Sequence, residues 1–200
     1  MPEKADASEF YLIGNNLSLD FINTEAVADG KPLDLIGETE SFLRWTKVVE
    51  LLEDAQIVKL REKSSDRKLL EIVEFRKVLR EMFVDLAQGK TIKNGEIERI
   101  NEQLKKQNGY SALEKNEDGL AKRFHAGYTE LLQLLVPIAE SAADLLIYGD
   151  VSLLKKCENP NCILYFYDTT KNHRRRWCSM AGCGNRAKAA AFYQRKKTQN

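Results

Sequence analysis

The clearest pattern along the chain is an apolar stripe with helical spacing over residues 65–87. Large apolar side chains recur there every three or four positions from Leu69 to Leu86, and Gly89 follows as a stop signal. The pattern predicts a long amphipathic helix that forms the spine of the core.

Weaker helical spacing predicts further helices over 39–52, 94–106 and 126–148. Thr39 is a suitable cap for the first of them. Pro137 should kink or split the last one, because proline lacks the N–H that a helix interior needs, and Gly149 should end it. Residues 10–13 are expected to form a short strand, whereas 17–24 fit either a strand or a helix.

Residues 110–125 alternate weakly between apolar and polar positions around a turn-rich centre at 116–119. This arrangement is typical of a β-hairpin. The N-terminal part is therefore expected to be an α+β domain that is predominantly helical and carries one small hairpin.

Length and composition indicate a protein with a substantial core. The chain has 200 residues, of which 43% are hydrophobic, which suits one medium domain with a small appendage. It contains no run of eighteen or more apolar residues, and its first residues lack the pattern of a signal peptide. We expect a soluble, cytoplasmic protein that does not bind membranes.

Charge divides the chain at Asp150. Residues 151–200 hold eleven basic and two acidic side chains, a net charge of +9, which leaves −8 for residues 1–150 within the total of +1. The asymmetry predicts two parts with different partners, a basic part suited to a polyanion and an acidic part that a polyanion would repel. We expect domains at 1–150 and 151–200.

All four cysteines lie in the basic part, as two pairs with four residues inside each pair and fifteen between the pairs: Cys157, Cys162, Cys178 and Cys183. Two close pairs with a short spacer let four thiolates converge on one zinc ion. The alternatives are two disulfides or four free thiols, and a reducing compartment disfavours disulfides. A shell of four thiolates has no open position for water or substrate, so the zinc should be structural rather than catalytic.

The residues around the cysteines predict the form of the module. A tight loop at 159–161, a strand at 164–167, a second turn at 179–182 and an Ala-rich helix from 185 to about 197 resemble a treble-clef zinc finger.

Basic side chains surround this module and are candidates for nucleic-acid contacts. Clustered arginine and lysine neutralise phosphates and release counterions. The alternative is a solvated surface, or contact with the acidic N-terminal part. Trp177 is expected in the core of the module, and His173 is not expected to bind zinc. The candidates are Lys171, Arg174, Arg175, Arg176, Arg186, Lys188 and Arg195.

Two stretches carry a resemblance to known families. Residues 176–186, preceded by Phe166-Tyr167-Asp168, resemble the CGNR zinc finger, which is named for the tetrapeptide that stands here at 183–186. Residues 19–24 are similar to the opening of the ABATE domain, which accompanies this finger in bacterial proteins described as stress-induced transcription regulators. The two stretches together span nearly the whole chain.

The resemblance implies an α+β N-terminal domain that senses a ligand and a zinc module that binds DNA. It implies Cys157, Cys162, Cys178 and Cys183 as zinc ligands, and makes Gly184, Asn185 and Arg186 candidates for turn formation and phosphate contact.

Candidate ligand-binding residues lie in the N-terminal part. Asp20 and Asn23 match the ABATE phrase and are placed to line a pocket, although both residue types also cap helices and fix turns. Arg76 and Arg80 lie one helical turn apart and could pair with Asp20 or receive an anionic ligand.

The leading hypothesis is a DNA-binding transcription regulator with a zinc finger and an N-terminal domain that senses a small molecule or stress signal. The alternative is a zinc-finger module that binds protein or RNA without direct DNA regulation. An enzyme is not expected, because the chain has only two histidines and no Gly-rich phosphate loop. A homodimer is expected, since one small finger offers limited contact with DNA.

Overall fold

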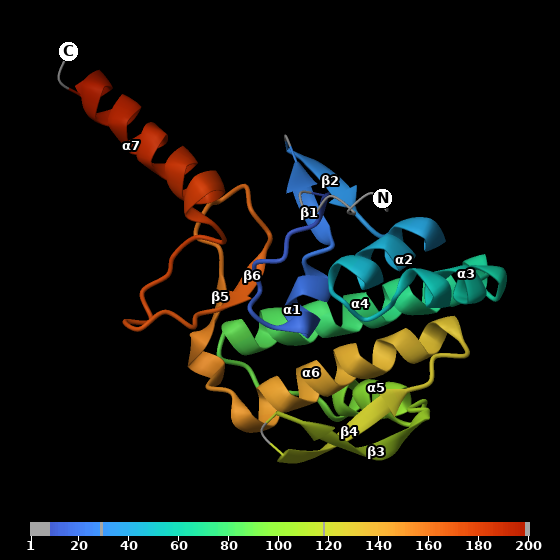
Figure 1. The fold of residues 1–200 in the computed structure, drawn as a ribbon. Helices are drawn as coiled ribbons and strands as arrows, with labels where there is room; N and C mark the ends of the chain where they lie inside the picture. The colour runs from blue at the N-terminus through green and yellow to red at the C-terminus, as the bar shows by residue number, and fades with distance from the viewer. Residues whose placement is uncertain (1–8, 29, 118, 199–200) are drawn as a thin grey trace.

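The longest element is helix α4 (Asp66–Ala87), which runs through the middle of the N-terminal part (Figure 1). The computed structural model describes residues 9–28, 30–117 and 119–198. The Ser65 side chain caps α4 by accepting a hydrogen bond from the Lys68 N–H, and Gly89 follows the helix with a left-handed φ of 77°. The helix predicted over 65–87 is confirmed.

Shorter helices pack around α4 and against one another. Residues 17–24, which fitted either a strand or a helix, begin with helix α1. Helix α6 packs on both α1 and α5. The predicted helix over 39–52 ends earlier, at Val48, and Glu50 then adopts a positive φ. A separate helix, α3, was not predicted. The helices are α1 (Leu17–Ile22), α2 (Thr39–Val48), α3 (Asp54–Glu62), α5 (Asn94–Leu104) and α6 (Leu135–Tyr148).

The segment predicted as a helix over 126–148 begins later, with the 3-10 turn η2 (Leu131–Leu134), and continues as α6. Pro137 lies in the first turn of α6, where its missing N–H removes no helical hydrogen bond, so the division falls ahead of the proline. The stretch Leu131–Tyr148 is long and apolar enough to cross a membrane by length and composition. Its buried side chains pack on the core of the helical domain.

In the described part of the chain, three two-stranded antiparallel sheets complete the fold. The hairpin predicted over 110–125 is confirmed, with Asn116 opposite Gly119 at its turn. The strand predicted over 10–13 is wrong, because this segment is not part of any strand. The hairpins are β1 (Glu25–Ala28) with β2 (Lys31–Asp34), β3 (Gly109–Asn116) with β4 (Gly119–Ala126), and β5 (Leu154–Lys156) with β6 (Tyr165–Tyr167).

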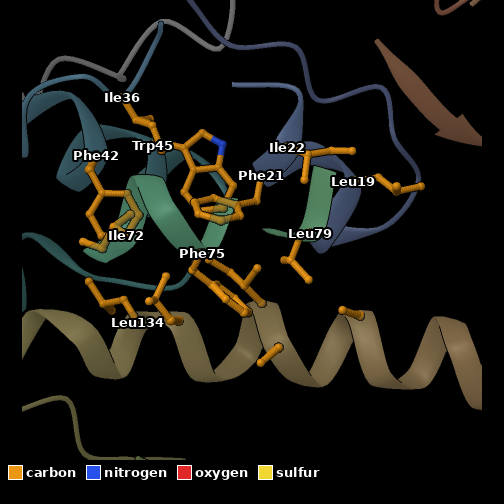
Figure 2. Close-up of a cluster of buried hydrophobic side chains, with 14 of the residues drawn as sticks. Leu19, Phe21, Ile22, Ile36, Phe42, Trp45, Ile72, Phe75, Leu79 and Leu134 are labelled. Atoms are coloured by element: carbon orange, nitrogen blue, oxygen red, sulfur yellow. The ribbon is translucent and has the colours of Figure 1, made fainter. Parts of the chain in front are cut away.

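One large apolar cluster joins the helices of the N-terminal part. The Phe21 ring lies near the rings of Trp45 and Phe75, and Trp45 stacks on Phe42. Leu79 on α4 belongs to the same cluster (Figure 2). All five side chains are fully buried. Burial of this much aromatic surface is the main stabilising term for the N-terminal part.

The C-terminal part follows α6 after the turn η3 (Val151–Leu153) and contains β5, β6, the π-type turn η4 (Met180–Gly184) and helix α7 (Asn185–Thr198). Leu154 and Tyr165 belong to the large core, whereas the cysteines form a second buried cluster with Leu164 and Phe166. Helix α7 extends away from the rest of the molecule (Figure 1). The predicted α+β class with a C-terminal zinc finger is confirmed.

Candidate metal centre and nucleic-acid interface

The four cysteines converge at the base of α7. Cys157, Cys162, Cys178 and Cys183 are all buried and unpaired by disulfides, and their sulfur atoms lie within 4.8 Å of one another. The Cys157 N–H donates to the Leu164 carbonyl, which sets the first pair beside the hairpin β5–β6.

The cluster fits a zinc ion. A tetrahedron with Zn–S bonds of about 2.3 Å has edges of about 3.8 Å between sulfurs, and the Sγ atoms of Cys162 and Cys178 lie 3.9 Å apart. The hydrogen bond between the two thiols lowers the pKa of Cys162 to about 5 and raises the pKa of Cys178. A second thiolate beside the first would be repelled by it unless a cation balances the charge. A bound Zn²⁺ would supply that charge, and the geometry of the four sulfurs is consistent with one structural zinc ion.

Local sequence explains both ligand loops. The Asn159 side-chain oxygen accepts the Asn161 N–H, which turns the chain between the first two ligands. The Ser179 hydroxyl accepts the Gly182 N–H and caps η4, so Cys183 returns toward Cys178. These turns bring the cysteines together, and Ala26 of β1 packs in the same buried cluster.

Hydrogen-bond donors point at the sulfur atoms. The Cys178 N–H donates to Cys157 Sγ at 3.4 Å, and Cys183 Sγ accepts from Asn159 Nδ2 and from the Arg186 guanidinium, each at 3.3 Å. A four-thiolate zinc centre carries net negative charge, and such donors stabilise it. Arg186, predicted to contact DNA, therefore also supports the metal centre.

Arg186→Ala is expected to weaken zinc binding by about 10–100-fold, because Cys183 loses a charged donor. Transfer of zinc to a chromophoric chelator measures the effect. Arg174→Ala is the matched control, since Arg174 is exposed and contacts no sulfur atom among the described residues. Equal zinc retention by the two variants would contradict this role of Arg186.

Asn23 joins the finger to the helical domain. It ends α1 and is fully buried, and its side chain donates to the Tyr165 carbonyl at 2.8 Å and accepts the Tyr165 N–H at 2.9 Å. The side-chain amide thus satisfies both the N–H and the carbonyl of one residue, as the backbone of a neighbouring strand would. The edge of β6 is thereby fixed to α1.

Other contacts reinforce this junction. Arg80 on α4 donates to the Glu25 carboxylate and to the Ile163 carbonyl in the finger. The Gly14 carbonyl accepts the Tyr167 N–H at 2.8 Å, and the Asn15 amide donates to the Tyr167 carbonyl. The finger is therefore held by both side-chain and backbone hydrogen bonds.

Arg175 lies inside this junction rather than on the outer surface. Its guanidinium donates to the carbonyls of Ile13 and Trp177 and stacks on the Phe166 ring at 4.0 Å. The Arg175 N–H donates to Asp168, a fully buried carboxylate that also accepts from Lys155. Although burial opposes ionisation, these hydrogen bonds hold the pKa of Asp168 far below its ordinary range.

Asp20 is a carboxyl group at the junction whose pKa is raised. Its carboxylate accepts the Gly14 N–H at 2.7 Å, and burial raises its pKa to about 6 despite that bond and the attraction of Arg175. A raised carboxyl pKa stabilises the folded state below the ordinary pKa of 3.8, and this contribution is lost as the pH rises through 6. At neutral pH the folded protein must keep a disfavoured charge there.

Asp20→Asn is therefore expected to raise the melting temperature at pH 7, and the difference from wild type should shrink as the pH falls from 6 to 4. Thermal melts across this pH range measure the effect. A variant that melts below wild type at pH 7 would show that attraction to Arg175 outweighs the cost of burial.

The other candidate nucleic-acid contacts lie outward. Lys171, Arg174 and Lys188 are exposed and have no ion-pair partner among the described residues. Arg176 is exposed and pairs with Glu158 at 2.6 Å, and Arg195 lies on the exposed side of α7. From the sequence alone, Arg174, Arg175 and Arg176 have the same expected role, although only Arg175 lies inside the junction.

The candidate ligand-binding residues do not form one cluster. The proposed pairing of Arg76 or Arg80 with Asp20 is wrong, because Arg76 binds Asp34 at 2.6 Å and Arg80 binds Glu25 at 2.9 Å. The two arginines line an open groove of about 550 Å³ between β2 and α4. Asp20 and Asn23 lie at the junction with the finger instead.

Comparison with protein families gives two matches in chain order. Residues 15–149 match the ABATE family, which is described as "Putative stress-induced transcription regulator", and residues 154–196 match the CGNR zinc finger. The resemblance drawn from residues 19–24 and 176–186 is confirmed by these matches. None of the curated proteins compared with the chain matches it.

Proposed function

The chain belongs to the ABATE family and carries a CGNR zinc finger, and on this basis we propose that it is a zinc-dependent, DNA-binding transcription regulator. The observation that carries the proposal is the charge of the finger. Fifty residues with a net charge of +9 are organised by one zinc ion, and the exposed Lys171, Arg174 and Lys188, which have no ion-pair partner among the described residues, can neutralise phosphates.

The N-terminal domain is the sensor in this proposal. Its core helix α1 ends at Asn23, which binds β6 directly, so a change in the helical domain that moves α1 would move the finger. The groove beside Arg76 and Arg80 is the place where an anionic small molecule or stress signal would bind. The anion would replace Asp34 or Glu25 as the ion-pair partner of the arginine. Coupling of this kind requires that the ligand prefer one position of α1.

The remaining features follow from the same proposal. A DNA-binding regulator acts in the cytoplasm of a bacterial cell, and a homodimer would double the contact with an operator. The proposal gives the chain no catalytic role, because the zinc shell consists of four cysteines and leaves no open coordination position.

The second candidate function is a finger that binds RNA or protein. The basic surface supports it as well, since phosphate contacts do not distinguish structured RNA from DNA. Competition in a mobility-shift assay with zinc-loaded protein separates the two. Preference for duplex DNA supports the regulator, whereas equal or stronger binding of RNA, or binding of neither, supports the second candidate.

A further inference from the structure

Helix α7 has little contact with the rest of the chain. It leaves η4 and extends outward (Figure 1), and of residues 185–196 only Ala187 is even half-buried. An isolated helix of this length is marginally stable in water, so α7 gains little from packing within its own chain. Binding to a partner would therefore stabilise α7.

The composition of α7 indicates the chemistry of that partner. Residues 185–198 contain five basic side chains, four alanines and no acidic residue. Alanine favours the helix and keeps its surface slim. A narrow, positively charged helix that packs little on its own chain complements a polyanion with a groove of matching width.

One side of α7 faces away from the finger. Ala187 and Ala190 line a shallow pocket with Pro160 and Trp177, so their side of the helix faces the finger. At 100° per residue, the opposite side carries Asn185, Lys188, Ala189, Phe192 and Lys196, with Arg195 beside them. The Lys196 ammonium lies 5.1 Å from the centre of the Phe192 ring, which is half exposed.

We propose that α7 enters the major groove of duplex DNA with this outer side against the bases, an inference that rests on the proposed function. The major groove, about 12 Å wide, admits an α-helix. Lys188 reaches guanine acceptors there, Phe192 contacts thymine methyl groups, and Lys196 with Arg195 binds phosphates. The alanines let the helix axis approach the bases closely.

The same geometry distinguishes DNA from double-stranded RNA. The major groove of A-form RNA is deep and narrow, and side chains on a helix cannot read it. The protein should therefore bind a 30-bp DNA duplex more tightly than an RNA duplex of the same sequence. A charged but unstructured tail would bind both.

The decisive variant breaks the helix without changing its charge. Ala191→Pro removes a helical hydrogen bond in the middle of α7, where the described side chains do not pack on the core, so the zinc content and the melting temperature should stay as in wild type. Affinity for the 30-bp duplex is expected to fall at least about tenfold. Ala191→Ser is the control that keeps the helix, and it should bind like wild type.

A charge variant tests the outer side directly. Arg195→Ala with Lys196→Ala, which removes the two proposed phosphate contacts, should reduce the slope of log affinity against log salt by about 2. The control, Lys115→Ala with Lys122→Ala, removes the same charge from the exposed hairpin β3–β4 and should leave the slope unchanged. Methyl green, which occupies the major groove, should displace the protein, and netropsin, which occupies the minor groove, should not.

The outcomes keep this inference apart from the proposed function. If Ala191→Pro binds duplex DNA like wild type, or if netropsin alone displaces the protein, the inference about α7 is overturned and the function stands. If the wild-type protein binds no duplex DNA, the proposed function itself fails. Loss of affinity in Ala191→Pro with retained zinc supports α7 as the helix in the groove.

Discussion

Cys178→Ser is expected to release the zinc ion, unfold the finger and abolish DNA binding. Structural zinc contributes about 10–16 kcal/mol to the folding of zinc-finger peptides, and a hydroxyl is a poor substitute for one of four thiolates. Among the described residues, the buried cluster around the cysteines adds Leu164 and Phe166 as large apolar side chains, with Ile13 and Trp177 partly buried against it, which is too little to replace the metal. Affinity for duplex DNA should fall at least about 100-fold, given the energy lost.

The measurements are zinc content, circular dichroism and a binding titration on one preparation. Most of the helical signal should remain, because the core around Phe75 and Trp45 does not include the cysteines. Chelation of zinc from the wild-type protein should reproduce the loss, and added zinc should restore binding. A serine variant that keeps one zinc ion per chain and binds DNA like wild type would contradict a closed four-cysteine centre.

Asn23→Ala is expected to lower the free energy of unfolding by about 2–6 kcal/mol. The substitution leaves the N–H and the carbonyl of Tyr165 buried without partners, and each unpaired group costs about 1–3 kcal/mol. That is a large part of the total stability of about 5–15 kcal/mol expected for a domain. Denaturant unfolding gives the free energy, and amide exchange at Tyr165 should become faster.

The matched control is Asn108→Ala. Asn108 also donates its amide to a backbone carbonyl, that of Gly127 at 2.7 Å, but the bond is exposed, so water replaces it at a cost of about 1 kcal/mol or less. Similar losses for the two variants would show that Asn23 does not hold the finger to α1. A large loss of unfolding free energy confined to Asn23→Ala would show that the junction is a specific interface between the finger and α1.

The sequence predicted the elements whose signals are local and long. Helix α4 repeats its apolar spacing over six turns between a serine cap and a glycine stop, and the hairpin β3–β4 has a turn-rich centre. The zinc ligands were predictable because metal binding fixes both residue type and spacing. The β1–β2 hairpin and α3 were missed, since strands of four residues and a weakly amphipathic helix give little periodic signal.

Roles that depend on distant partners were not predictable. Asn23 acts on a residue 142 positions away, and its type alone fits a cap equally well. Arg175 stands between Arg174 and Arg176 in one basic run, yet it points into the junction while its neighbours are exposed. Only packing, which places Ile13 and Phe166 beside Arg175, separates the three.

The most direct test of the central claim is the affinity of the zinc-loaded, full-length protein for duplex DNA across a series of salt concentrations. The account predicts binding at low salt that weakens steeply, with log affinity falling at a slope of about −4 to −5 against log salt for about four to six phosphate contacts. Absence of duplex binding at low salt by protein that holds its zinc would contradict it.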